Sequence, residues 1–280
     1  MPDLGPASVT IPGALPCPCL VDPRRGLFFD LYGTLVDIRT DEDDPWVYAT
    51  LARSLAYLGA AIGPEELQRE YKNRVRCHLE RSPEQFPEVD VHVVFQEILS
   101  EHTRGRNSSG ADGPPGAQPG DDATDARAAA VFFRSLSRRQ FAAFTGVHPV
   151  LERLRTKYRL GLISDAQWVF TEPELAMADL DRFFPVRVLS SRIGVKKPDL
   201  RLFAQAMSAL GVAPESCLYV GDNPPRDLVG ARNAGMRCVL FRGQNVSYNG
   251  LRPDACFDAY ADLEAIVDRL LGGRSDGGDP

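Results

Sequence analysis

The stretch FFDLYGTLVD, residues 28–37, is an apolar run that leads to a single carboxylate, Asp30. A glycine and a hydroxyl, Gly33 and Thr34, follow at once. This order is typical of a buried strand that delivers an acidic nucleophile into a tight phosphate-binding turn. Tyr32 stands out there, because a second acid two places after the nucleophile would assist proton transfer. The stretch therefore predicts both a fold and a chemistry, and it poses a question about Tyr32.

The rest of the chain supports an α/β fold. Residues 26–29 form a short apolar run, and from residue 147 onward apolar runs alternate with segments of helical periodicity. We expect strands near residues 159–163, 186–189, 217–220, 237–241 and 256–257, and helices over 149–158, 168–179, 199–210, 226–234 and 263–270. Strands separated by helices in this way predict a doubly wound, Rossmann-like parallel sheet that is covered on both faces.

A block of helical pattern interrupts this rhythm after the first strand. Helices are expected from residue 45, over 64–80 and 89–102, and over 126–144, whereas DIRTDEDDP (residues 37–45) is too acidic and broken to continue a sheet. We interpret residues 38–146 as an inserted α-helical cap domain, and residues 23–37 and 147–271 as the α/β core. Within the cap, residues 104–124 are rich in Gly, Pro, Ser and Asp and are predicted to be disordered, as are the tails over 1–22 and 272–280.

The composition of the chain argues against nucleic acid and membranes as binding partners. The net charge of −6 provides no overall positive field for nucleic acid or an anionic membrane. No apolar run approaches the length of a membrane span, and the N-terminal stretch has no basic leader. The six cysteines form no recognisable metal-ligand set, and reduced thiols suit a cytoplasmic protein. A small-molecule substrate and a monomer or homodimer are expected.

Several polar residues follow the predicted strands directly, where ligands bind in open parallel sheets. They are Asp30, Thr34, Ser164, Asp165, Lys197, Asp222 and Asp227. Each one alone is typical of a helix cap after a βα turn. Together, in this order, they indicate displacement at phosphorus.

In that chemistry Asp30 attacks as a nucleophile and forms an acyl phosphate. Thr34 and Ser164 hold non-bridging oxygens, with Asp165 beside them at the substrate. Lys197 offsets the negative charge of nucleophile and phosphoryl group. Asp222, with Asp30, supplies hard oxygen ligands for Mg²⁺.

The chain resembles the haloacid dehalogenase-like superfamily, in the subgroup whose helical cap is inserted after the first strand. The matching stretches are DLYGTLV (30–36), LISDA (162–166), GVKKPDLRLF (194–203) and GDNPPRD (221–227). The resemblance implies that Asp30 is the nucleophile and Lys197 the motif lysine, with Lys196 a solvated neighbour. It also implies that Asp222 and Asp227 are acids of a Mg²⁺ site, which takes the backbone carbonyl of Tyr32 as a further ligand.

Tyr32 leaves the activity open. Phosphatases of the superfamily usually have Asp at this position, and tyrosine, with a reference pKa of about 10, cannot replace a carboxylate as a general base near neutral pH. Three interpretations remain: a Mg²⁺-dependent phosphatase acting on a small phosphorylated metabolite, a metal-independent 2-haloacid dehalogenase, and a weakly active or inactive binding protein. The family resemblance implies that dehalogenases commonly have serine in place of Asp222 and tyrosine in place of Phe203. Asp222 and Phe203 therefore favour a phosphatase-type hydrolase.

Overall fold

The computed structural model of the protein describes residues 24–103, 122–243 and 247–272. The tail predicted over residues 1–22 lies outside the described residues, as does most of the segment predicted to be disordered, residues 104–124. The tail predicted over 272–280 also lies outside them, except for Gly272, which ends helix α10 (Tyr260–Gly272). The end of that segment is described. It belongs to helix α4 (Asp122–Ser137), so the helix begins inside the segment.

The core is a six-stranded sheet in which all neighbouring strands are parallel. The strand order is β5-β4-β1-β6-β7-β8, with bounds β1 (Gly26–Phe29), β4 (Arg159–Ser164), β5 (Val186–Leu189), β6 (Cys217–Gly221), β7 (Arg237–Phe241) and β8 (Ala255–Phe257). The chain adds β4 and β5 on one side of β1, then crosses to place β6 on the other. The ends of β1, β4 and β6 thus surround a switch point, where ligands bind in such sheets. The predicted α/β fold is confirmed.

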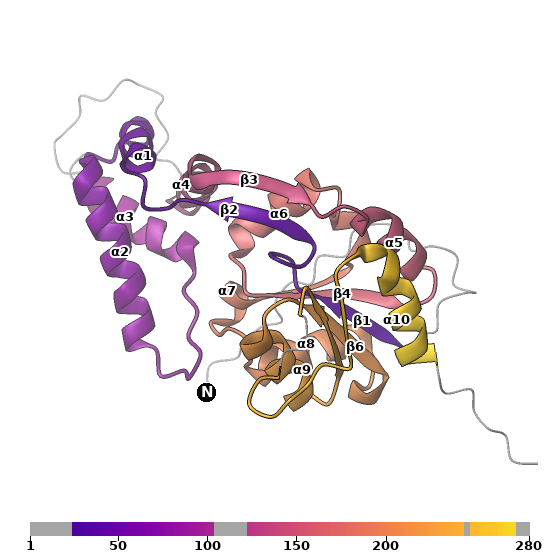
Figure 1. Ribbon diagram of the computed structural model, residues 1–280. Helices are drawn as coiled ribbons and strands as arrows, with labels where there is room; N and C mark the ends of the chain where they lie inside the picture. Colours follow the sequence, from indigo (N-terminus) through magenta and orange to yellow (C-terminus); the bar gives the residue numbers. More distant parts are fainter. Residues whose placement is uncertain (1–23, 104–121, 244–246, 273–280) are drawn as a thin grey trace, which may run out of the picture.

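Helices cover both faces of the sheet (Figure 1). On one face α5 (Val147–Leu154) packs against α10 (Tyr260–Gly272), and on the other α8 (Leu200–Leu210) packs against α9 (Val229–Asn233). Side chains along β1 alternate between these layers, because Leu27 and Phe29 join one buried cluster and Phe28 joins the other. The remaining short elements are α6 (Trp168–Met177), α7 (Ser190–Ile193), the 3₁₀ turns η1 (Asp181–Phe183) and η2 (Pro214–Ser216), and the π-helical turn η3 (Pro224–Leu228).

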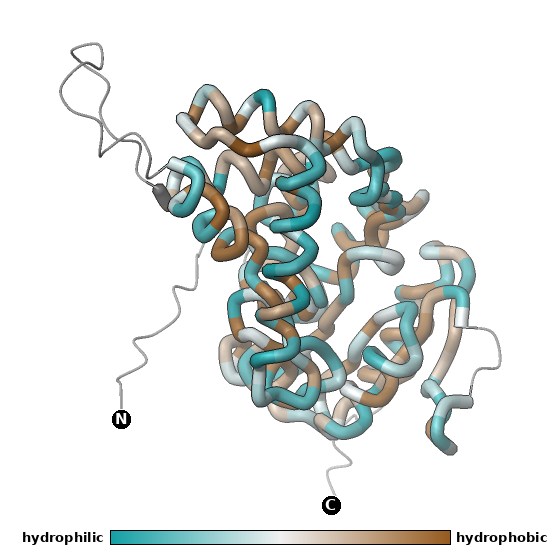
Figure 2. Tube along the Cα trace, turned by 90° about the vertical axis from the view of Figure 1, so that its left-hand side faces the viewer, coloured by the Kyte–Doolittle hydropathy of each residue, from teal (hydrophilic) through white to brown (hydrophobic). Residues whose placement is uncertain are grey.

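Helices also fill the stretch between β1 and α5. They are α1 (Pro45–Tyr57), α2 (Pro64–Arg81), α3 (Val91–Thr103) and α4. Tyr48, Tyr71, Phe95 and Phe133 bring one aromatic ring from each helix into a shared core, with Tyr71 and Phe133 4.8 Å apart between ring centroids. The outer side of α2, which lies on the left of Figure 1 and faces the viewer in Figure 2, is largely hydrophilic.

The predictions for both ends of this helical block are wrong. Residues 37–40, part of the stretch 37–45 expected to be too acidic and broken to continue a sheet, belong to β2 (Val36–Thr40). The end of the helix expected over 126–144 is β3 (Arg138–Ala143). The two strands pair antiparallel, with Val36 opposite Ala143. About a hundred residues separate the partners, so local periodicity carried no sign of the pairing. The helix expected over 226–234 is likewise divided between η3 and α9.

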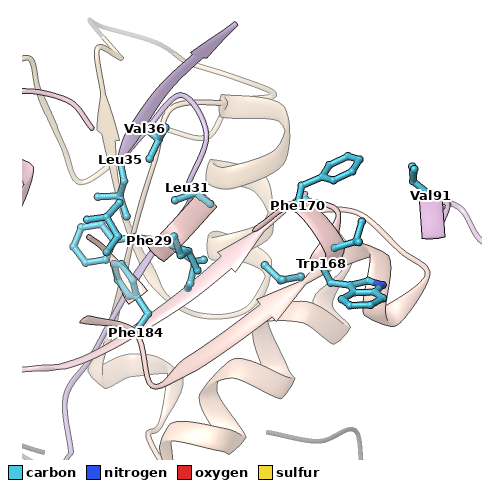
Figure 3. Close-up of a cluster of buried hydrophobic side chains, with 14 of the residues drawn as sticks. Phe29, Leu31, Leu35, Val36, Val91, Trp168, Phe170 and Phe184 are labelled. Atoms are coloured by element: carbon cyan, nitrogen blue, oxygen red, sulfur yellow. The ribbon is translucent and has the colours of Figure 1, made fainter. Parts of the chain in front are cut away.

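Apolar residues anchor the chain where it leaves β1. Figure 3 shows Phe29, Leu31, Leu35 and Val36 in a buried cluster with Phe184, whose ring lies 5.9 Å from that of Phe29. This packing on both sides of residues 32–34 fixes the loop that follows Asp30.

Candidate active site

The loop after β1 holds Asp30 at the centre of the sheet. The Asp30 amide donates to the carbonyl of Val220 on β6, at 2.9 Å. Its Oδ1 accepts hydrogen bonds from the Leu31 amide, at 2.8 Å, and from the Ser164 hydroxyl, at 2.6 Å. The loop turns at Gly33, which has a φ of +84°, and a Cβ there would lie 2.6 Å from Asp222 Oδ2. Glycine is therefore required both by the backbone conformation and by the closeness of Asp222.

Lys197 lies beside Asp30 and is almost fully buried. Its Nζ is 3.0 Å from Asp30 Oδ2 and 2.7 Å from Asp227 Oδ1, and it donates to the Tyr219 hydroxyl at 2.8 Å. Burial acts to lower the pKa of Lys197, but the nearby carboxylates, Asp227 first, raise it above its ordinary value. The lysine is therefore a fixed positive charge next to Asp30.

Asp30, Asp222 and Asp227 each place a carboxylate oxygen within 4.8 Å of the others. Burial, opposed by Lys197 and reinforced by Asp227, raises the pKa of Asp30 to about 7. Burial followed by Asp227 also raises the pKa of Asp222. The site thus carries more negative charge than its lysine offsets, and its donors are the hard oxygens that Mg²⁺ prefers. These residues fit a divalent cation.

The three acids have different surroundings. Asp227 has four donors: its Oδ2 accepts from the amides of Asp222 and Asn223, at 3.0 and 2.8 Å, and its Oδ1 accepts from Lys197 and, at 3.1 Å, from the Tyr219 hydroxyl. Asp222 instead accepts one hydroxyl, that of Thr34, at 2.9 Å. Asp227 is thus occupied in holding the lysine and the loop after β6, whereas Asp30 and Asp222 keep more oxygen lone pairs for a cation.

The other predicted residues reach the same place with different contacts. The Ser164 hydroxyl donates a hydrogen bond to Asp30, and the Thr34 hydroxyl donates one to Asp222. Asp165, expected beside the substrate, accepts the Lys197 amide at 2.8 Å and lies 3.4 Å from the Arg226 guanidinium. It thus orients the backbone of the lysine. The structure brings all seven predicted polar residues together.

The Tyr32 side chain turns toward α6. Its hydroxyl donates to Glu174 Oε2 and lies 3.4 Å from the Thr171 hydroxyl. Arg134, on α4, binds both oxygens of Glu174, at 2.8 and 3.2 Å, and its guanidinium lies 5.4 Å from the centre of the Tyr32 ring. Burial, with the charge of Glu174, raises the pKa of Tyr32 above its ordinary value. The phenol is held as a neutral donor to a buried ion pair.

Sequence reasoning missed Glu174, Arg134 and Tyr219. Glu174 follows Phe170 by one helical turn, and this spacing places an acid on a buried helix face, which usually requires a partner. This spacing was a signal that could have pointed to Glu174, although it does not identify Arg134 or Tyr32 as its partners.

A pocket of about 380 Å³ opens on Lys197, between α2, the loop that follows it and the loops after β5 and β6. A second hollow of about 500 Å³ lies along α2 and α3, and none of its lining residues belongs to the site. Among the described residues, no helix has the length and apolar character needed to cross a membrane.

Comparisons with known proteins agree with this geometry. Residues 122–241 match the family model described as haloacid dehalogenase-like hydrolase. The chain is 36% identical over 145 residues to a phosphoserine phosphatase of Thermus thermophilus, which covers 51% of this chain and 52% of that protein. It is 39% identical over 98 residues to a glyceraldehyde 3-phosphate phosphatase of Pyrococcus abyssi, covering 35% of this chain and 41% of that protein. The chain thus spans about half the length of the curated relatives that it matches.

Among solved structures, a 2-haloacid dehalogenase from Pseudomonas syringae superposes with a TM-score of 0.58 and 22% sequence identity, covering 88% of this chain and 99% of that one. At this identity the likeness shows the fold alone.

Proposed function

We propose that this chain, which belongs to the haloacid dehalogenase-like hydrolase superfamily, is a Mg²⁺-dependent phosphatase acting on a small phosphorylated molecule. One observation carries the proposal: Asp30 lies 3.0 Å from Lys197 while two further carboxylates gather within 4.8 Å of it. A carboxylate nucleophile for phosphorus needs a cationic surrounding, and a cluster of acids with one lysine reaches it by binding a divalent cation. The phosphatase names of the sequence relatives support the same activity.

The residues of the site suggest how the reaction proceeds. Asp30 Oδ1 is held by the Leu31 amide and the Ser164 hydroxyl, so Oδ2 is the oxygen that attacks phosphorus. The bond from phosphorus to the leaving oxygen breaks as the bond to Asp30 forms. Water then attacks the aspartyl phosphate, which releases inorganic phosphate and restores the carboxylate. Lys197 would hold a phosphoryl oxygen during both displacements, and Ser164 and Thr34 would do so by turning their hydroxyl protons from Asp30 and Asp222 toward the bound group.

Asp30, Asp222 and the backbone carbonyl of Tyr32 would hold Mg²⁺, with Asp227 positioning the loop after β6. When bound, the ion neutralises charge shared by the nucleophile and the phosphoryl group. Tyr32 supplies no proton to the leaving oxygen, because its hydroxyl donates to Glu174. The proposed enzyme thus favours leaving groups that depart as weak bases or that take a proton from water.

The helices between β1 and α5 fit the role of a cap over this site, with boundaries near residues 38 and 146. The four described cysteines are free thiols, which suits the proposed cytoplasmic location. The proposed assembly is a monomer or homodimer.

Tyr32 favours a second candidate, a 2-haloacid dehalogenase, because a departing halide needs no proton and the resemblance to dehalogenases includes a tyrosine at this position. A third candidate is a binding protein with weak or no turnover. A panel of phosphate esters and 2-haloacids, each assayed with Mg²⁺ and with EDTA, separates the three. Phosphate release that requires Mg²⁺ is expected. Halide release that EDTA does not affect would instead establish the dehalogenase. Inactivity on both classes of substrate would establish the binding protein.

A further inference from the structure

The pocket that opens on Lys197 has two chemically different walls. One wall comes from the end of α2 and the loop after it, and the other from the loops after β5 and β6. Its lining residues are Leu79, Gln85, Phe86, Pro87, Lys196, Lys197 and Arg226. The first wall is mostly apolar, and the second is entirely basic. Because Lys197 Nζ also lies 3.0 Å from Asp30 Oδ2, this pocket adjoins the proposed nucleophile.

The apolar wall is firmly attached to the core. The Phe86 carbonyl accepts the Lys196 amide at 2.8 Å, and the Glu88 amide donates to the Gly194 carbonyl at 3.0 Å. The Glu88 side chain accepts the Ser190 hydroxyl at 2.8 Å. These bonds join the loop to the segment that precedes Lys197, so the width of the pocket is set by the fold.

The positive charges of the basic wall are only partly neutralised by the acidic side chains near them. Lys196 is half-buried, and no carboxylate of the described residues lies within 4.0 Å of its ammonium. The nearby acid is Glu88, whose pKa is raised by burial against the opposing charge of Lys196. Arg226 is about half exposed, and its ion pair, with Asp165, is long at 3.4 Å. Asp165 is already bonded to the Lys197 amide. Two cationic groups therefore face the pocket without close neutralisation.

We propose that this pocket selects phosphate monoesters whose leaving group carries a second anionic group, such as a carboxylate or another phosphate. Lys196 and Arg226 bind that group, while Leu79, Phe86 and Pro87 cover a short carbon skeleton between the two charges. The volume of about 380 Å³ limits the substrate to a small molecule. This inference rests on the proposed phosphatase activity, and it names the class of substrate for the same site.

Binding of non-hydrolysable analogues tests the inference without turnover. Isothermal titration with saturating Mg²⁺ compares phosphonopropionate, which has the second anion, with propylphosphonate, which lacks it. We expect phosphonopropionate to bind at least tenfold more tightly, and K196Q and R226Q each to reduce that ratio about three- to tenfold. K72Q is the matched control, because it removes the same positive charge from the surface of α2, outside the pocket. It should leave the ratio unchanged.

Turnover supplies an independent arm. Hydrolysis of p-nitrophenyl phosphate with Mg²⁺ tests the proposed function alone, and kcat/KM for phosphoserine against phosphoethanolamine tests the second anion. Equal affinity for the two phosphonates, undetectable binding of phosphonopropionate, or a ratio that K196Q/R226Q leaves intact would overturn the inference. Loss of p-nitrophenyl phosphate hydrolysis with the binding preference intact would overturn the phosphatase proposal instead.

Discussion

Replacing Asp30 by asparagine is expected to abolish hydrolysis and, at the same time, to stabilise the metal-free protein above neutral pH. The amide is nearly isosteric with the carboxylate, and its oxygen still accepts from Leu31 and Ser164. It is a poor nucleophile, so the acyl phosphate does not form. It also removes a negative charge from a site in which burial opposes charge.

The size of the stabilisation follows from linkage. Burial raises the pKa of Asp30 from an ordinary 3.8 to about 7, so between these values the folded state binds a proton that the unfolded state releases. Stability from this group is present at low pH and is lost as the pH rises through about 7. At about 1.4 kcal/mol per pH unit, raising the pH from about 5 to about 8 lowers the free energy of unfolding of the wild type by about 3 kcal/mol through Asp30. The asparagine of the variant does not titrate, and the other acids are common to both proteins.

Chemical denaturation of both proteins in EDTA at pH 5 and pH 8 measures this effect. The difference in free energy of unfolding, Asp30→Asn minus wild type, should grow by about 3 kcal/mol between the two pH values, or about 5–10 °C in Tm. Phosphate release with Mg²⁺ is measured in parallel. A difference independent of pH would refute the raised pKa of Asp30, and turnover of the variant at the wild-type rate would remove Asp30 from the mechanism.

Mg²⁺ should raise the Tm of the wild type more at pH 8 than at pH 5.5, because protons compete with Mg²⁺ for Asp30 and Asp222, whose pKa values are raised. An equal shift of Tm in thermal scans at both pH values would argue against these two acids as Mg²⁺ ligands. Glu174→Ala should destabilise the protein by about 3 kcal/mol, since it leaves Arg134 buried without its partner, and adding Arg134→Gln should recover part of the loss in urea denaturation. Tyr32→Asp alone should raise kcat/KM on an alkyl phosphate little, while Tyr32→Asp with Glu174→Gln should raise it more; a single variant that outperforms the double would show that Glu174 does not oppose a carboxylate at position 32.

The sequence predicted the core because its information there is local. Each strand of the sheet is a short apolar run, and the polar residue after it reaches the site through the topology that parallel strands impose. Asp30, Ser164 and Asp222 could therefore be placed together without knowledge of a single side-chain contact. Their hydrogen bonds, such as that of Thr34 to Asp222, depend on side-chain orientation and were not predictable in this way.

What the sequence did not reveal depends on partners far apart in the chain. β2 and β3 exist because each supplies the other's hydrogen bonds, and RRQFAAF alone is compatible with the end of a helix. The role of Asp227 is a similar case. The sequence predicts Asp227 as an acid of a metal site, and that role stays a prediction; its hydrogen bonds to the amides of Asp222 and Asn223 and its ion pair with Lys197 were not predictable from the sequence.

Tyr32 is explained only by residues from two other helices. Its hydroxyl donates to Glu174, and Arg134 neutralises that carboxylate with two hydrogen bonds while lying against the tyrosine ring. An aspartate at position 32 would place a second carboxylate beside Glu174. The single guanidinium of Arg134 would then face two acids, so one buried carboxylate would have no counter-charge. Tyr32, Glu174 and Arg134 are thus one unit, in which a tyrosine two residues after Asp30 and a buried acid on α6 belong together. Helix α4 supplies Arg134 to this unit, so a helix from the stretch between β1 and α5 fixes the side chain two residues after Asp30.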